Sequence, residues 1–227
     1  MQYFFLALMT LSFFTGDCLI RAASADYEPR LLQSVELIYD EPFAEDGPLP
    51  NNERWVIRQN TRWSVKDGVL IGEVADEAYQ KKMQAEGDGH DGTRPVIFLT
   101  PIPSVFAVQM RVRYDETENK GRNRGSLLDL GHHANSFIFG SPQTKLTLQK
   151  EKKIFIDGDF FPLNRWNDVT IEFKDGTLLI DVNGRTEIIE HPLIKLRTDR
   201  EIQQLDFKGQ DFGTVQIDWV KLYRGTE

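Results

Sequence analysis

Apolar and polar residues alternate along much of this chain in short runs that turn residues separate. The run from Ser104 to Tyr114 has apolar side chains at every second position, a period of two that is typical of a half-buried β-strand. The segment 168–189 alternates in the same way and is divided by Asp175-Gly176 and Asn183-Gly184, dipeptides that favour tight hairpin turns. This segment is therefore predicted to form a three-stranded meander.

Shorter runs predict further strands at regular intervals between residues 34 and 223. The segment 76–94 is different, because its helix-like start leads into a stretch rich in Gly and Asp. We predict a long polar loop there, with at most one helical turn. Many short strands indicate an all-β fold, and the long strand and long loops favour a jelly-roll sandwich of two antiparallel sheets.

The one long apolar run, residues 3–14, has the length of a signal-peptide core and is too short to span a bilayer. Ala23-Ser24-Ala25 follows it as a small-residue cleavage pattern. We expect residues 1–25 to be a signal peptide and residues 26–227 a single domain, exported to the periplasm or beyond and free of the membrane after cleavage. The alternatives are a buried N-terminal helix and a lipid anchor at Cys18, although Asp17 stands where lipoprotein signals carry a small residue. Cys18 is the only cysteine, so the mature domain would have no disulfide.

The formal net charge is −8, and removing the signal leaves it unchanged because Asp17 and Arg21 cancel. Phosphate backbones require a basic surface, so nucleic acid is excluded as the expected partner. The same charge disfavours a polyanionic glycan and favours neutral substrates or cations. The chain also has no P-loop and no nucleophile-elbow or dinucleotide fingerprint, which argues against nucleotide cofactors and common serine hydrolase chemistry.

Several segments resemble a known group of proteins. They are Val35–Phe43, Arg62–Gly72, Arg165–Glu172, Leu178–Gly184 and Val215–Tyr223. Together they resemble concanavalin A-like lectin/glucanase sandwiches, and within that group the bacterial 3-keto-disaccharide hydrolase family, over most of residues 34–224. The resemblance implies a concanavalin A-like jelly roll that cleaves a carbohydrate or glycoside, with 3-keto glycosides as the family's substrates.

Two departures from the related patterns affect the expected chemistry. The stretch Arg124–Leu130 stands where the family has an N-S-G-I strand leading towards its sugar site. The E-x-D-x-x-E strand of laminarinase-type glucanases is absent, so we do not expect the two-carboxylate retaining mechanism. A 3-keto group would allow another route, in which one base removes the C2 proton and an electrophile holds the ketone oxygen.

The candidate base is His132 or His133, because histidine titrates near neutral pH. In an extended chain these neighbours would point to opposite faces, and a turn at Gly131 would be needed to bring both into one site. The candidate partner of the carbonyl or hydroxyl is Arg111, whose guanidinium is a fixed fork of donors. Solvated surface roles are the alternative for all three side chains.

The candidate substrate-binding residues are Gln109, Arg113, Asn135, Glu73 and Arg94. The first two share the polar face of the long strand with the candidate arginine, Asn135 follows the histidine pair, and the last two flank the long loop. Solvated sheet residues and a flexible polar lid are the alternative interpretations.

Asp218 lies in the last predicted strand, and the resemblance implies that it helps to hold a structural calcium ion. A hydrogen-bonded edge aspartate is the alternative. A divalent cation is therefore the only cofactor that the sequence suggests.

Two other functions stay open at this stage. One is a non-catalytic carbohydrate-binding or adhesion module, and the other is a structural protein of the cell envelope. A catalytic site predicts a pocket in which His132 or His133 lies within hydrogen-bond reach of an acid or an arginine. A binding module predicts an open groove with an exposed aromatic ring.

Overall fold

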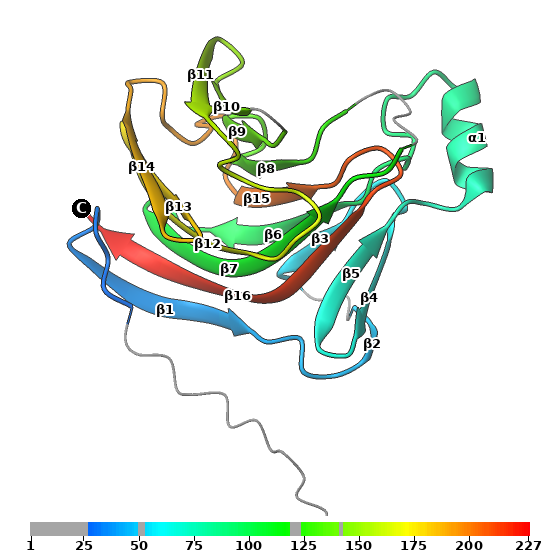
Figure 1. The fold of residues 1–227 in the computed structure, drawn as a ribbon, viewed down its shortest axis with the longest axis horizontal. Coiled ribbons are helices and arrows are strands. Elements are labelled where there is room, and N and C mark those ends of the chain that lie inside the picture. Colours follow the sequence, from blue (N-terminus) through cyan, green and yellow to red (C-terminus); the bar gives the residue numbers. More distant parts are fainter. Residues whose placement is uncertain (1–26, 50–52, 119–123, 141–142) are drawn as a thin grey trace, which may run out of the picture.

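A computed structural model describes residues 27–49, 53–118, 124–140 and 143–227, so the predicted signal peptide lies outside the described residues. The described chain folds into two antiparallel sheets, which form the two layers of a jelly-roll sandwich, and one helix (Figure 1). This confirms the predicted fold class.

Sheet A contains the long strands of the fold. In spatial order its strands are β14 (Arg185–Glu190), β13 (Thr177–Val182), β12 (Asn167–Lys174), β7 (Phe106–Asp115), β16 (Thr214–Thr226), β5 (Val69–Glu73), β4 (Arg62–Lys66) and β2 (Gly47–Pro48), and β1 (Ser34–Glu41) also pairs with β16. The predicted meander corresponds to β12, β13 and β14, and the long alternating run corresponds to β7.

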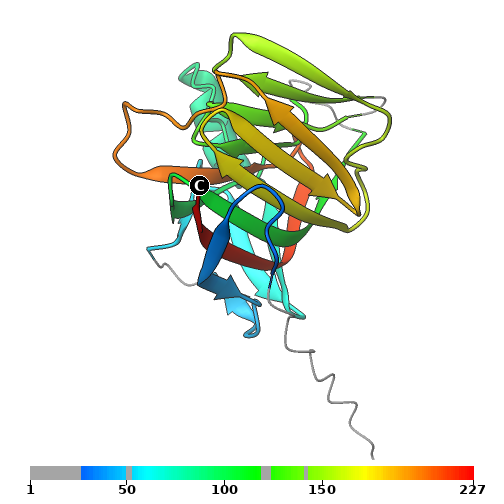
Figure 2. The ribbon, with the colours of Figure 1, turned by 90° about the vertical axis from the view of Figure 1, so that its left-hand side faces the viewer.

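Sheet B is the second layer. In spatial order its strands are β11 (Lys152–Asp157), β10 (Gln143–Leu148), β9 (Asn135–Ile138), β8 (Leu127–Leu130), β15 (Gln203–Lys208), β6 (Val96–Ile102) and β3 (Trp55–Ile57). The connection between β14 and β15, residues 191–202, joins the two sheets and projects from the side of the sandwich (orange in Figure 2).

The core lies between the sheets and follows the alternation of the sequence. Val108 and Met110 of β7 are fully buried, as are Leu128 of β8 and Phe207 of β15. Burying each such side chain contributes about 1.5–3 kcal/mol, so a sandwich of this size has a large core without disulfides. The residues between them, such as Arg111, consequently point outward from their sheet.

The first described residues are fixed to the outer face of sheet A by Glu172, a buried carboxylate on β12. Its Oε1 accepts hydrogen bonds from the Tyr27 hydroxyl (2.6 Å) and the Arg30 N–H (2.8 Å), and its Oε2 accepts from the N–H groups of Leu31 (2.7 Å) and Leu32 (3.0 Å). The N-terminal segment is therefore part of the folded domain.

Helix α1 (Glu77–Ala85) corrects the prediction of a loop over 76–94. The Asp76 side chain accepts a hydrogen bond from the Tyr79 N–H (2.8 Å), and Glu77 pairs with Lys81 at 2.7 Å across one helical turn. None of its residues is buried, so there was no apolar periodicity to reveal it. Within the described part of the chain, no helix has the length and apolar character needed to cross a membrane.

Candidate functional site

A row of polar side chains crosses the outer face of sheet B. Asp206 of β15 stands directly opposite Asp129 of β8, and Asp129 stands opposite Ser136 of β9. Their sequence neighbours Leu128 and Leu205 face the core, so alternation turns both carboxylates away from it. The Ser136 hydroxyl donates to Asp129 Oδ1 at 3.0 Å.

The turn between β8 and β9 folds back over this row. Gly131, His132 and His133 all adopt left-handed backbone conformations, with φ of 77°, 50° and 75°. As a result both imidazoles lie over the carboxylates, with ring centroids 4.5 Å apart. The turn at Gly131 on which a shared site depended is therefore present.

Each histidine has its own carboxylate. His132 Nδ1 lies 3.2 Å from Asp206 Oδ2, and His133 Nδ1 lies 3.1 Å from Asp129 Oδ2. The backbone N–H of His133 also donates to Asp129. The carboxylates are fully buried, whereas the side chain of His133 is 41% exposed, so His133 connects a buried charge with solvent.

Lys208 joins the two carboxylates beneath the histidines. Its Nζ lies 3.1 Å from Asp129 Oδ2 and 2.7 Å from Asp206 Oδ2, and its side chain is almost completely buried. Two buried carboxylates would repel each other strongly, and the ammonium compensates part of that charge. With neutral histidines, the three residues carry a net charge of −1.

The pKa of Asp129 reflects opposing effects. Burial acts to raise it, but the hydrogen bond from His133 and the positive charge of Lys208 outweigh burial and hold the pKa at about 2. Asp129 is consequently ionised at neutral pH, and an ionised carboxylate favours the His133 tautomer that carries its proton on Nδ1.

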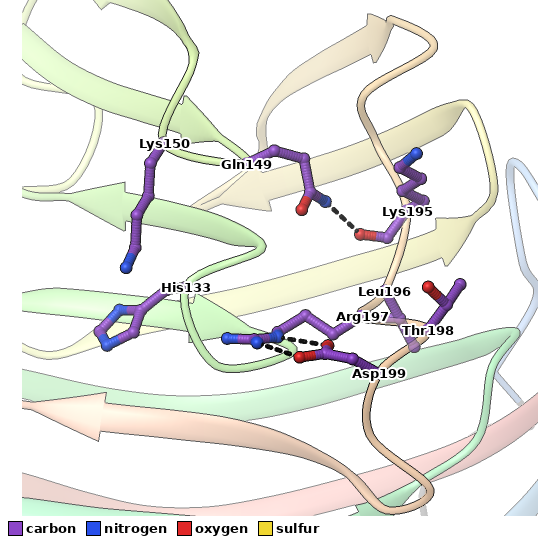
Figure 3. A pocket seen from close by; sticks show the side chains of 8 residues that line it. All are labelled: His133, Gln149, Lys150, Lys195, Leu196, Arg197, Thr198 and Asp199. Atoms are coloured by element: carbon purple, nitrogen blue, oxygen red, sulfur yellow. Dashed lines mark hydrogen bonds and ion pairs between the residues drawn. The ribbon is translucent and has the colours of Figure 1, made fainter.

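A pocket of about 420 Å³ opens beside His133, and His132 is not among its lining residues. Its walls come from the β8–β9 turn, the β10–β11 turn and the 191–202 connection (Figure 3). The side chains of Lys150 and Arg197 point towards His133, whereas the ammonium of Lys195 points away. The lining residues are His133, Gln149, Lys150, Lys195, Leu196, Arg197, Thr198 and Asp199.

Hydrogen bonds tie these three segments together. The carbonyl oxygen of Lys195 accepts from Gln149 Nε2 (2.8 Å) and from Asn135 Nδ2 (3.2 Å). The Gln149 N–H donates to the carbonyl of Ala134 at 2.6 Å. Gln203 Nε2 donates to the carbonyl of Arg197 at 2.7 Å, so the pocket walls are fixed before any ligand binds.

The charged groups of the pocket differ in their partners. Arg197 holds Asp199 through two parallel hydrogen bonds, of which Nε to Oδ1 measures 2.8 Å, and this hydrogen bonding lowers the pKa of Asp199. Arg197 Nη1 is left to face the pocket. Among the described residues, Lys150 has no ion pair.

The structure does not bring Arg111 together with the histidines, which corrects the expectation of a shared site. Alternation places Arg111 on the polar face of β7 as predicted, but β7 belongs to sheet A, and that face is the opposite surface of the sandwich. There its Nε lies 3.9 Å from Asp168 and 3.8 Å from Asp218, and its guanidinium lies over the Trp166 ring.

Gln109 and Arg113 lie on the same outer face of sheet A, far from the pocket. Gln109 accepts a hydrogen bond from the Tyr223 hydroxyl (3.0 Å), and Arg113 Nε donates to Asp115 (2.6 Å). Asp218 is the carboxylate beside Arg111. Within the described ranges, no group of three or more His, Cys, Asp or Glu side chains could hold a metal ion. Calcium also takes backbone carbonyls and water as ligands, so the calcium role of Asp218 stays a prediction.

The remaining sequence-predicted residues have other surroundings. Glu73 pairs with Arg62 at 3.3 Å at an exposed position. Arg94 is buried and donates to the carbonyls of Gly209 (2.9 Å) and Gly125 (3.0 Å). Asn135 is the exception, because it supports the pocket wall through Lys195 without lining the pocket.

Sequence reasoning missed Asp206, Lys208, Lys150 and Arg197. A signal for the first two exists in the run Gln203–Lys208, where polar residues alternate with buried Leu and Phe. The two pocket cations lie in a turn and a loop, where no periodicity marks them. The fold and site together define a jelly-roll sandwich with a histidine–carboxylate cluster on the outer face of sheet B.

No protein-family model matches the chain, and no curated protein matches it. Several solved structures of the same fold do match the chain. SCLam, a non-specific endo-β-1,3(4)-glucanase from family GH16, has a TM-score of 0.59 and 12% identity over 87% of this chain and 94% of its own. The endo-β-1,3-glucanase from Pyrococcus furiosus has a TM-score of 0.53 and 12% identity over 85% of this chain and 95% of its own.

A GlcNAcα1-4Gal-releasing endo-β-galactosidase from Clostridium perfringens has a TM-score of 0.56 and 10% identity, covering 88% of this chain and 66% of its own. At such identities the likeness establishes the fold, the concanavalin A-like jelly roll found in these glycoside hydrolases. The resemblance to the 3-keto-disaccharide hydrolase family stays a prediction.

Proposed function

We propose that this chain is an exported glycoside-cleaving enzyme of hydrolase or lyase type, with His133 as its general base. The observation that carries the proposal is that His133 lines a pocket while its Nδ1 lies 3.1 Å from the buried, ionised Asp129. A histidine held by a carboxylate on one nitrogen presents the other nitrogen to a substrate. The glycosidases that share the fold support a sugar substrate.

The paired-carboxylate mechanism of retaining and inverting glycosidases does not suit this site. That mechanism needs one carboxyl group to protonate the leaving group and a second, accessible one to act as nucleophile or base. Asp129 and Asp206 are both buried and both held by Lys208. They are arranged to support the histidines and not to touch a glycosidic bond.

A 3-keto glycoside fits a single base. The ketone acidifies the C2 proton, which His133 Nε2 takes, while the developing negative charge on the ketone oxygen is stabilised by Arg197 Nη1. The electron pair then forms the C1–C2 double bond as the C1–O bond breaks, and the aglycone leaves with that bond's electrons and takes up a proton. Addition of water across the double bond gives the free 3-keto sugar. Arg197 thus takes the role that the sequence suggested for Arg111.

The test uses the chain purified after export. We expect it to release the aglycone from 3-keto-glucosides and not from the parent glucosides, with the same rate in the presence of a chelator. His133→Gln should lower the rate of release by about a thousandfold. Binding of glycans without turnover of any 3-keto-glucoside would overturn the proposal and support a binding module. Export itself predicts a purified chain whose first residue is Asp26.

A further inference from the structure

The pocket beside His133 has the opposite charge to the protein as a whole. The chain carries a formal net charge of −8. The pocket is lined by three cations, Lys150, Lys195 and Arg197, and one carboxylate, Asp199. Because Asp199 is already engaged by Arg197, no carboxylate of the lining is left to neutralise the lysines.

Lys150 differs from the other two cations in where its charge is placed. It occupies the β10–β11 turn next to Gln149, and both residues are left-handed, with φ of 63° and 49°. This turn directs the Lys150 ammonium towards His133 and the guanidinium of Arg197, whereas the Lys195 ammonium points out of the pocket (Figure 3). Among the described residues Lys150 is the pocket cation that is both unpaired and directed at the base.

Lys150 is exposed, so its ammonium can meet a ligand that enters the pocket. Its flexible stem and charged head let it adjust to an incoming anionic group. A bound anionic group would lie between the ammonium and the guanidinium and would accept charge-assisted hydrogen bonds from both. The same group would then lie beside His133, where the proposed chemistry takes place.

We propose that the substrate carries one anionic group on its sugar, a carboxylate or a sulfate or phosphate ester, and that Lys150 is the residue that selects it. This inference rests on the proposed function, because it names the substrate class of the same site. A single anionic group is required, since a long polyanion would be repelled by the acidic remainder of the surface.

The experiment measures binding of methyl β-D-glucoside, methyl β-D-glucuronide, glucose 6-sulfate and glucose 6-phosphate by calorimetry. We expect at least one of the three anionic sugars to bind about tenfold more tightly than the neutral one, the ratio expected of a charge-assisted hydrogen bond. The anionic sugar that binds most tightly shows whether the pocket recognises a carboxylate, a sulfate ester or a phosphate ester. The preference should shrink as salt is raised, because the site is open to solvent.

Two matched variants locate the selectivity. Lys150→Gln should abolish the preference, so that the anionic and neutral sugars bind equally, and the neighbouring Gln149 shows that glutamine is accommodated in this turn. Lys195→Gln removes the same charge from the same rim and should keep the preference. Equal binding of all four sugars to the unmodified chain would overturn the inference, as would equal losses in the two variants. In either case the chain could still turn over neutral 3-keto-glucosides. Failure of this inference is therefore distinguishable from failure of the proposed function.

Discussion

His133 Nδ1 lies 3.1 Å from Asp129 Oδ2, while the adjacent His132 reaches a different carboxylate, Asp206, at 3.2 Å. The two histidines therefore occupy one turn but have separate surroundings. His133 lines the pocket, and His132 packs edge-on against Phe98 with ring centroids 5.8 Å apart. This difference is the basis for proposing His133, and not His132, as the general base.

Substituting the histidines one at a time should separate these roles. His133→Gln is expected to lower kcat for a 3-keto-glucoside by about a thousandfold, the scale of a lost general base. His132→Gln should change kcat by less than about tenfold, because its ring does not line the pocket. Steady-state kinetics with both variants measures this, and equal losses would contradict the assignment of the base.

Lys208 should be essential to the stability of sheet B. Lys208→Met leaves Asp129 and Asp206 facing each other without compensation, which is expected to lower the free energy of unfolding by about 3–5 kcal/mol. Urea denaturation measures the change. Lys145→Met is the control, because Lys145 of β10 lies on the same outer face of sheet B and has no ion pair among the described residues. The free energy of unfolding of this variant should lie within about 0.5 kcal/mol of the parent value.

A double variant tests whether Lys208 stabilises the fold through its contact with Asp129. Combining Lys208→Met with Asp129→Asn removes one of the two repelling charges, so the double variant should be more stable than Lys208→Met alone. If the two losses simply add, the ammonium does not act through Asp129.

Acid should weaken the fold through Asp129. Its folded pKa, about 2, lies below the unfolded value of about 3.9, so the ionised form stabilises the fold above about pH 4 and this contribution is lost as the pH falls towards 2. The contribution is about 2–3 kcal/mol, since one pKa unit corresponds to about 1.4 kcal/mol. In Asp129→Asn it should be absent, so the stability difference between parent and variant should shrink over this interval. A difference that stays constant from pH 5 to pH 2 would show that Asp129 does not titrate in this way.

Glu172 should control the N-terminal segment. Glu172→Ala removes the acceptor of four hydrogen bonds to residues 27–32 and should speed amide exchange at Leu31 and Leu32 and expose the segment to proteases. Asp168→Asn on the same outer face of β12 is the control, because its contact with Arg111 is long. Unchanged exchange in Glu172→Ala would mean that the segment is held by its apolar contacts alone.

The strands could be predicted from the sequence because burial imposes a period of two on side chains. That rule located β7 and the β12–β14 meander and assigned Arg111 to a polar face. It could not say which layer of the sandwich that face belongs to, because alternation is the same in both sheets. Arg111 was consequently expected in a site that lies on the opposite surface.

The site itself depends on features that a periodic pattern does not encode. His132 and His133 meet because three consecutive residues take left-handed conformations, and only Gly131 hints at this. Lys208 meets Asp129 because β15 pairs with β8 across 79 residues of sequence. Helix α1 went unrecognised for a related reason, since it has no buried face.

The left-handed turn at 131–133 also affects how this chain can change over generations. Glycine adopts that conformation at lower cost than histidine, but each imidazole also compensates a buried carboxylate. Replacing His132 or His133 would therefore exchange backbone strain for an uncompensated charge on Asp206 or Asp129. The two rings and the two carboxylates are consequently expected to be kept or lost together as the sequence changes.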